Sequence, residues 1–291
     1  MNLSPDDRST LAQSLRGTLD PTADPLDNDA ALVELGWHDM VESGPDAVGV
    51  VFEVLGMTGS SSTVLDDVVA VAAGLEPGST VGLPRWGSAE RPTTIALGSA
   101  RLDTQRLAGL RPVAGIDPEL GFVECDASLL LFGDEDRWPA VVTAARAAIG
   151  AWLFGMARAM LEMARTHAVD RTQFGRPIGS FQAVRHKLAD VHVAIEAADP
   201  ALAAVGNGTL DSDLARVLAG QAAAVASMHC QQILAGVGFT EEHGFHRYMK
   251  RAMFVDGLFG TTSSICAELG RGLLRDNSVP RTVQLQAHAP R

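Results

Sequence analysis

The chain has 291 residues, of which 46% are hydrophobic and 20% charged, so it is long enough to bury a large core. Its formal net charge of −12 repels phosphate backbones and anionic lipids, which disfavours nucleic acid and membranes as partners. The cysteines are far apart and form no CxxC pair, which favours reduced thiols over disulfides: Cys125, Cys230 and Cys266. Because the first ten residues are polar and acidic, unlike a signal peptide, we expect a soluble cytoplasmic protein.

Residues 1–75 have the pattern of a helical domain. Leu11, Leu15 and Leu19 repeat at a spacing of four, which places them on one face of a helix. Three short segments of helical pattern follow, namely ALVELGW, AVGVVFEVLG and TVLDDVVAVAAGL. Glycines and serines at 56–62 separate the last two segments.

Residues 76–136 change to short β-favouring runs, which Gly, Pro and Asp interrupt. The runs are GSTVGLPRW, PTTIALG, GLRPVAG and LGFVECD, and LLLF at 129–132 is a candidate for one more strand. We therefore expect a small β domain in the middle of the chain.

Residues 137–276 return to helical patterns, and residues 277–291 lack periodicity and are expected to form a loose tail. An apolar stripe that includes Ile149, Leu153 and Met156 predicts one long helix with a buried face, which GRPIG at 175–179 ends. A second helix is expected to close before Pro200.

Asp211 or Ser212 is expected to cap a third helix that runs to Leu234, and a last helix is expected over 263–274. Strands and helices do not alternate, so the chain lacks the pattern of a Rossmann fold. The order instead predicts a mainly α protein with a helical domain, a small β domain and a C-terminal four-helix bundle.

The string DRTQFGRPIGSFQAVRHKLADVH, which begins at Asp170, is the most specific motif in the chain. RxxFG alone is weak, but here IGxFQAVxHxLAD follows it at the start of a predicted helix. A second string, QQILAGVGFTEEHGFHRYMKRA, lies at the matching distance downstream. Together the strings resemble the acyl-CoA dehydrogenase family, flavoenzymes that desaturate acyl-CoA thioesters, and the order of helices, β domain and helices matches that family.

The resemblance implies an FAD site completed across a subunit interface. The matching positions are Arg171, Phe174, Gln182, Gln232, Gly236, Thr261 and Ser263. The first two match residues that meet the flavin dinucleotide of a neighbouring subunit, and the next three match its adenine-side and pyrophosphate contacts. The last two match residues that follow the family's catalytic glutamate. A guanidinium forms charge-assisted bonds to pyrophosphate, and glycine lets backbone N–H groups approach phosphate oxygens.

The family's catalytic base is missing from both of its usual positions. The reaction needs a carboxylate that removes the α-proton while the β-hydride leaves for the flavin. The position of the usual glutamate corresponds to Phe259, and the alternative position, just before Arg146, corresponds to Ala145. Neither side chain accepts a proton. Asp256 is a candidate substitute, although an aspartate at that place is more simply interpreted as a solvated charge on a turn.

Retained dinucleotide contacts, a missing base and a shortened β domain resemble the smaller chain of heterotetrameric, two-gene acyl-CoA dehydrogenases of actinobacteria. Several of those enzymes act on CoA esters of steroid side chains and rings. The resemblance implies that a second, longer dehydrogenase-like chain supplies the base and most of the FAD pocket. Two other hypotheses stay open: a homo-oligomeric flavoenzyme that uses Asp256, and a flavin-free scaffold or acyl-CoA-binding protein.

Two further clusters have a functional and a structural interpretation. Arg247, Lys250 and Arg251 are either a contact to cofactor or CoA phosphates or a salt-bridged interface patch, and the patch is the favoured interpretation. His243 and His246 form an HxxH motif, but no third ligand follows nearby, so we expect no metal site.

Overall fold

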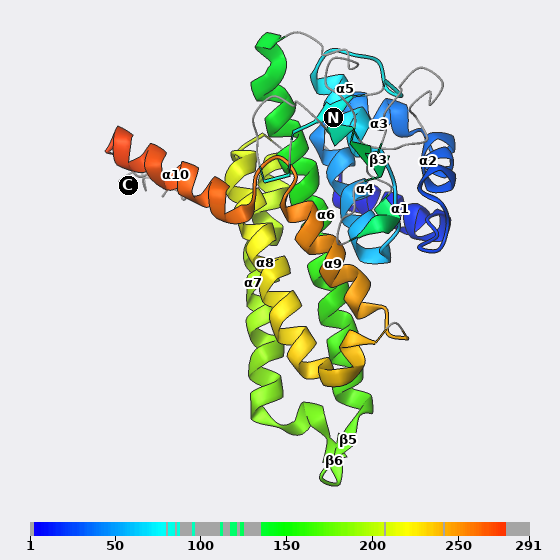
Figure 1. Ribbon diagram of the computed structural model, residues 1–291, viewed down its shortest axis with the longest axis vertical. Helices are drawn as coiled ribbons and strands as arrows, with labels where there is room; N and C mark the ends of the chain where they lie inside the picture. The colour runs from blue at the N-terminus through cyan, green and yellow to red at the C-terminus, as the bar shows by residue number, and fades with distance from the viewer. Residues whose placement is uncertain are drawn as a thin grey trace, which may run out of the picture.

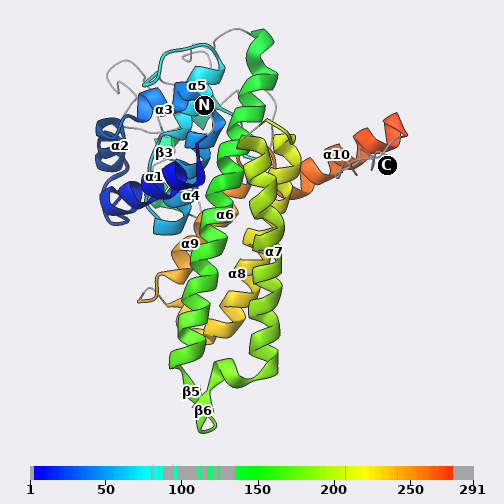
Figure 2. The ribbon, with the colours of Figure 1, turned by 180° about the vertical axis from the view of Figure 1, so that it is seen from behind.

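The computed structural model of the chain describes residues 3–79, 81–84, 86–87, 95–96, 111–112, 117–120, 123–124, 135–206, 208–240 and 242–277. Within these residues a group of short helices and a small sheet lie beside one end of a long helical bundle (Figure 1 and Figure 2). The mainly α fold is therefore as predicted. The predicted strand at 129–132, and the predicted loose tail beyond residue 277, lie outside the described residues.

Five helices form the N-terminal part: α1 (Pro5–Thr18), α2 (Pro25–Glu34), α3 (Trp37–Ser43), α4 (Pro45–Thr58) and α5 (Leu65–Ala72). Ser4 and Asp24 cap the first two helices with side-chain bonds to backbone amides, and proline follows each cap. The predicted face of α1 is confirmed, because Leu15 and Leu19 are buried and Leu11 packs against the core.

The C-terminal part is a bundle of α6 (Trp138–Asp170), α7 (Gln182–Gly206), α8 (Ser212–Leu234) and the shorter α9 (Phe245–Asp256). A hairpin of β5 (Thr172–Gln173) and β6 (Arg176–Pro177) joins α6 to α7, where a break is predicted. The 3-10 helix η5 (Ala235–Phe239) follows α8. Asp211 caps α8, as predicted. The last helix, α10 (Thr262–Asp276), projects from the bundle as an arm (Figure 1).

By length and composition, α6 is the one helix of the described residues that could cross a membrane. In this fold, however, 72% of its most apolar stretch is buried inside the protein. Met156 and Met160 lie fully buried on it, as the sequence predicts. The apolar composition of α6 is thus accounted for by its central position in the bundle, where α4, α7, α8 and α9 contact it.

The predicted end of the second bundle helix before Pro200 is wrong, because α7 continues through this proline to Gly206. Proline lacks a backbone N–H, and in a helix interior it costs about 3 kcal/mol. Ala198 and Ala201 on either side of it are buried. Packing of α7 along α8 therefore offsets the local cost, which a reading of the sequence alone does not include.

The helices α4 and α6 meet at two glycines. A Cβ atom on Gly155 would lie 2.0 Å from the carbonyl oxygen of Glu53, and one on Gly56 would lie 2.3 Å from that of Trp152. Phe52 packs beside this contact, edge to face with Trp152 at 5.7 Å between ring centroids. The N-terminal part is thus fixed to the bundle by a close approach of the two backbones.

The small sheet is antiparallel, with strand order β1-β2-β4-β3. Its strands are β1 (Gly82–Leu83), β2 (Ile95–Ala96), β3 (Arg111–Pro112) and β4 (Val123–Glu124), and each falls in one of the four predicted β runs. After β1, the indole N–H of Trp86 donates to the carbonyl oxygen of Phe254 on α9 at 3.0 Å. The same ring covers Gly257 so closely that a Cβ there would lie 1.9 Å from its Nε1.

We predict that Gly155→Ala lowers the free energy of unfolding by about 1–3 kcal/mol, because the added methyl group has no space at the α4–α6 contact. Thermal unfolding measures the effect. The control is Gly49→Ala on α4, where a Cβ would meet no atom within 4 Å. That change should keep or raise the melting temperature, and equal values for both variants would contradict the close contact.

Candidate functional site

The hairpin between α6 and α7 lies at one end of the bundle (Figure 1), and it carries an exposed aromatic residue. Phe174 lies at its tip with 93% of its surface exposed and a φ angle of +54°. A left-handed backbone at a residue other than glycine costs about 1–2 kcal/mol. Backbone strain of this kind is concentrated at ligand clamps and active sites, so the tip has the character of a contact surface.

Arginine side chains keep the hairpin ordered. The guanidinium carbon of Arg176 lies 4.2 Å from the ring centroid of Phe181, which meets the ring of Phe174 edge to face at 6.2 Å. Arg185 donates from Nε to the carbonyl oxygen of Gly179 at 2.9 Å. These contacts use few of the arginine N–H groups and leave the others available to a ligand.

The hairpin end of the bundle also gathers positive charge: Arg171, Arg176, Arg185 and Lys187. In the described part of the chain, none of these four forms an ion pair with a carboxylate, whereas Arg146, Arg216 and Arg251 elsewhere do. Unpaired cations in a protein with a net charge of −12 create a local field that attracts anions.

The pKa of His167, in the last turn of α6, lies below its ordinary value. Burial lowers the pKa of His167, and the charges of His243 and Arg171 lower it further. Asp170 acts in the opposite direction but is the smallest of these influences. Burial is thus the largest influence on this pKa, and the nearby positive charges add to it.

The predicted residues Gln182, Gln232 and Gly236 lie at the same end of the bundle. Gln182 begins α7, and the side-chain oxygen of Gln232, near the end of α8, accepts a hydrogen bond from Lys187 of α7. Gly236 is exposed in η5, and a Cβ atom on it would meet nothing within 4 Å. These three residues thus lie at the same end of the bundle as Arg171 and Phe174.

Thr261 and Ser263 lie instead at the corner between α9 and α10, away from the hairpin (Figure 1). Thr261 is the N-cap of α10, and its hydroxyl accepts from the backbone N–H of Ser264 at 3.2 Å. The hydroxyl of Ser263 lies 3.1 Å from that of Thr261. Helix capping accounts for Thr261, and the structure does not place this pair with the other five residues.

Both predicted base positions are packed inside the protein. Phe259 is fully buried with a φ angle of +54°, and its ring stacks on Trp138 at 6.1 Å between centroids. Its carbonyl oxygen accepts from Nε of Arg146 at 3.0 Å, which fixes the loop. Ala145 is also fully buried. Apolar side chains therefore fill the two places from which a carboxylate would act.

Asp256, the candidate substitute, is occupied by local bonds. Its carboxylate lies 3.1 Å from the fully buried guanidinium of Arg216 and also accepts from the hydroxyl and backbone N–H of Thr262. Burial lowers the pKa of Arg216, and the charge of Asp256 opposes this effect. The carboxylate is therefore the counter-ion that closes the α9–α10 corner, a role that competes with accepting a proton.

An open cavity of about 580 Å³ lies between α8 and α9, and we name it the methionine groove after Met228, Met249 and Met253 in its lining. Met228 and Met253 are 54% and 51% exposed. Gln232 and Asp256 also line it, so it extends from the hairpin end of α8 toward the α9–α10 corner. Methionine side chains adapt to many shapes, which suits a surface that another molecule covers.

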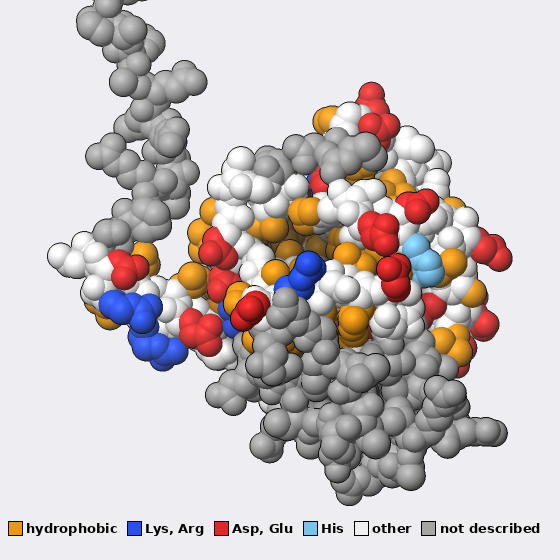
Figure 3. Space-filling view, turned by 90° about the horizontal axis from the view of Figure 1, so that it is seen from above, with side chains coloured by type: hydrophobic (Ala, Val, Ile, Leu, Met, Phe, Trp, Pro, Cys, Tyr) orange, Lys and Arg blue, Asp and Glu red, His pale blue; other side chains and the backbone are white. Residues whose placement is uncertain are grey.

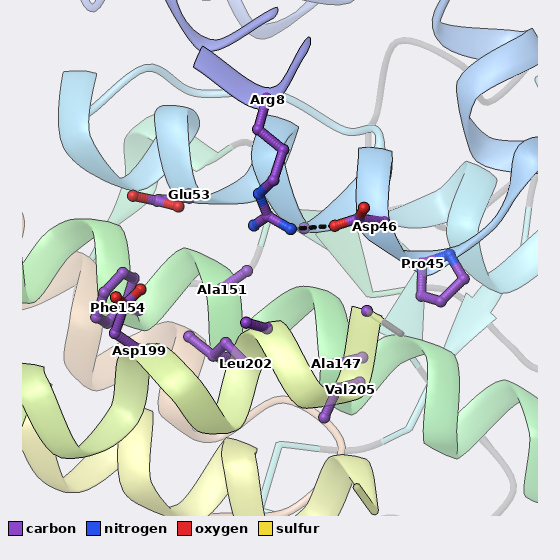
Figure 4. A pocket seen from close by; sticks show the side chains of 13 residues that line it. Arg8, Pro45, Asp46, Glu53, Ala147, Ala151, Phe154, Asp199, Leu202 and Val205 are labelled. Atoms are coloured by element: carbon purple, nitrogen blue, oxygen red, sulfur yellow. Dashed lines mark hydrogen bonds and ion pairs between the residues drawn. The ribbon is translucent and has the colours of Figure 1, made fainter. Parts of the chain in front are cut away.

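A much smaller cavity, of about 30 Å³, lies between α4, α6 and α7 (Figure 4). Arg8 forms an ion pair with Asp46 above it, and Asp46 also accepts from the backbone N–H of Leu3 at 2.7 Å. The volume suits about one water molecule. This cavity is too small for a cofactor, and its charged residues hold α1 against α4.

The salt-bridge interpretation of the basic cluster is confirmed, and a contact to cofactor phosphates is not supported. Arg251 is buried and pairs with Asp117 at 2.8 Å and Glu119 at 3.3 Å. Arg247 pairs with the same Glu119 at 2.7 Å. Lys250 remains exposed. These pairs fasten the segment before β4 to α9.

The HxxH histidines make local bonds. His243 accepts from the backbone N–H of Phe245 at 3.2 Å, and Nδ1 of His246 lies 2.9 Å from the carbonyl oxygen of His243. No three His, Cys, Asp or Glu side chains of the described residues are grouped so that they could hold a metal ion.

Sequence reasoning missed Arg176, Arg185 and Lys187 as members of the positive end of the bundle. The sequence could have indicated them, because all three cations lie inside the motif that begins at Asp170, close to the start of one predicted helix. It also missed Asp117 and Glu119, because no local pattern shows that they pair with residues more than a hundred positions away.

The sequence of the chain is similar to those of known proteins. Residues 140–274 match the family model of the acyl-CoA dehydrogenase C-terminal domain. The acyl-CoA dehydrogenase IpdE2 of Mycobacterium tuberculosis is 33% identical over 162 residues, which cover 54% of this chain and 50% of that protein. The chain thus spans about half the length of this curated relative.

Solved structures show the same fold. A variant of the Tcur3481–Tcur3483 steroid ACAD matches with a TM-score of 0.77 and 18% identity, covering 94% of this chain and 99% of that chain. The ChsE4–ChsE5 complex from Mycobacterium tuberculosis matches with a TM-score of 0.69 and 18% identity, covering 96% and 99% respectively. At this level of identity the likeness concerns the fold.

We predict that Asp256→Asn lowers the free energy of unfolding by about 2–3 kcal/mol, because it leaves the buried Arg216 without its charged partner. Urea unfolding followed by circular dichroism measures this loss. The control is Glu268→Gln, which removes a partly exposed partner of Arg146 while Asp213 remains. It should change stability by less than about 1 kcal/mol. Unchanged stability in Asp256→Asn would refute the structural role of this carboxylate.

Proposed function

We propose that the chain is a subunit of a heteromeric, FAD-dependent acyl-CoA dehydrogenase, because it has the acyl-CoA dehydrogenase fold and residues 140–274 match the C-terminal domain of that family. In this proposal it completes the FAD site of a second, longer dehydrogenase-like chain, in an assembly with two copies of each. The observation that carries the proposal is a positive, strained contact surface in a chain whose base positions are filled by Phe259 and Ala145.

The residues at the hairpin end fit the dinucleotide part of FAD. Arg171 has no carboxylate partner in the described residues and offers charge-assisted bonds to a pyrophosphate. The exposed ring of Phe174 offers an apolar face, and the open space at Gly236 lets another molecule approach the backbone. FAD, when bound, supplies the acceptor for the β-hydride. The role of this chain is to bind and orient the cofactor's nucleotide end.

Removal of the α-proton is then the task of the partner chain. Phe259 stacks on Trp138 and is fully buried, so it neither accepts a proton nor leaves space for a carboxylate to enter. The reaction assigned to the complex is α,β-desaturation of an acyl-CoA thioester. The likeness of this fold to a steroid ACAD motivates a steroid-derived CoA ester as its substrate.

Two exposed apolar surfaces support a partner chain. The methionine groove presents Met228 and Met253, and the α10 arm presents Leu273 and Leu274, which are 40% and 82% exposed. Ion pairs of Arg146 with Glu268 and of Arg216 with Asp256 hold the base of the arm. A fixed helix with exposed leucines is costly in water and is stabilised when another chain covers it.

A homo-oligomeric enzyme with Asp256 as its base is the second candidate, because this carboxylate lines the methionine groove. Its pairing with Arg216 argues against it. The discriminating observation is direct: the purified chain alone would have to be yellow and reduce an electron acceptor with an acyl-CoA. A flavin-free scaffold would leave the complex colourless.

We predict that Arg171→Ala weakens FAD retention in the co-purified complex by about 10- to 100-fold in Kd, the effect of losing a bond to a charged group. Flavin absorbance after gel filtration measures the bound fraction. The control is Arg165→Ala on the same helix, where the side chain is exposed and already pairs with Glu162. Equal flavin loss in both variants, or no loss in either, contradicts the assignment.

We also predict that Met228→Glu disrupts assembly with the partner, because a carboxylate in an apolar interface must lose its hydration. Light scattering of co-expressed chains gives the mass of the complex. Val33→Glu on α2, where the side chain is 41% exposed, is the control and should assemble normally. Normal assembly of the Met228 variant would show that the groove is not the interface.

A further inference from the structure

A cavity of about 550 Å³ opens at the end of α6 opposite the hairpin. It lies between α3, α4 and α5 on one side and the first turns of α6 with the α7–α8 loop on the other. Figure 3 shows the molecule from this end, where a hollow has a hydrophobic lining. The volume is within the range of about 300–1,000 Å³ that is usual for sites of small molecules.

This cavity is separate from the site proposed above. Neither Phe259 nor Ala145 lines it, and none of the five residues at the hairpin end does. Ala144, in its wall, and Arg171, at the far end of α6, are separated by roughly 40 Å at a helical rise of about 1.5 Å per residue. Binding here would therefore require neither FAD nor a catalytic base.

The walls are made of small apolar side chains, including Val48, Val68, Val71 and Ala147. Among the described residues of the lining there is no Lys, Arg or His, and the charged one is Asp211. An anionic ligand such as a phosphate or carboxylate would lie beside this negative charge. The interior therefore favours a neutral apolar molecule.

One polar group in the lining lacks a partner. Ser212, the first residue of α8, is 3% exposed, and its hydroxyl oxygen has no hydrogen-bond partner among the described residues. Buried hydroxyl groups are normally hydrogen-bonded, because leaving them unpaired is unfavourable. Asp211 beside it already caps α8 through the N–H of Asp213. The hydroxyl of Ser212 is thus a candidate donor for a molecule in the cavity, which it reaches by rotation of its side chain.

We propose that this cavity binds a neutral, apolar small molecule with one carbonyl or hydroxyl oxygen, which forms a hydrogen bond with Ser212. The apolar body lies against Val68, Val71 and Ala144. We expect a molecule other than a CoA ester, since the nucleotide part of CoA is anionic and the described part of the lining offers no cation.

The probe for the test is Prodan, a neutral naphthyl ketone whose emission moves to the blue in apolar surroundings. Titration of the full chain should give a saturable blue shift. Ser212→Ala should weaken binding by about five- to ten-fold, the effect of one lost hydrogen bond. Val71→Phe, at a partly exposed position of α5, should block the cavity and abolish the shift, while circular dichroism shows whether the variant is folded.

The matched control is Ser227→Ala, which changes a serine in the lining of the methionine groove and should leave the affinity unchanged. Absence of a saturable shift overturns the proposal. So does equal affinity in the parent, Ser212→Ala and folded Val71→Phe proteins, or a loss that follows Ser227→Ala. The titration contains neither flavin nor partner chain, so its failure is distinct from failure of the proposed function.

Discussion

The buried guanidinium of Arg146 is the interaction on which the corner between α9 and α10 depends. It holds the carbonyl oxygen of Phe259 at 3.0 Å, pairs with Asp213 at 2.8 Å and reaches Glu268 on α10 at 3.2 Å. One side chain therefore fixes the loop that carries Phe259 and the direction in which α10 leaves the bundle. Because all three contacts come from one buried guanidinium, we expect the loop and the start of α10 to keep a single arrangement.

The proposed two-chain enzyme accounts for two features at once, the filled corner between α9 and α10 and the exposed hairpin. The corner is closed by Phe259, whereas the hairpin presents an exposed Phe174 and cations that have no carboxylate partner among the described residues. A strained, exposed aromatic ring is retained in a stable fold only if the surrounding structure supports it. Under the proposed division of the chemistry between two chains, the hairpin binds the cofactor and the corner has no part in catalysis.

Much of the fold could be predicted from the sequence, because the evidence was local: each β run, the face of α1 and the cap at Asp211 depend on residues close together. Pro200 was misjudged, since burial against α8 outweighs a local penalty. The joint position of Gln182 and Gln232 was implied by motifs. The pairing of Arg251 with Asp117, and the cavity at Ser212, arise from tertiary packing that no short pattern encodes. The domain limits and the cytoplasmic location remain predictions.

The ratio of flavin to protein in the complex with the longer chain tests the central claim most directly. Absorbance gives the amount of flavin, and light scattering gives the mass and hence the number of each chain. If this chain only completes a site whose base belongs to its partner, the complex holds one FAD for each pair of unlike chains. One FAD for every chain, or flavin bound by this chain when it is purified alone, would contradict the account.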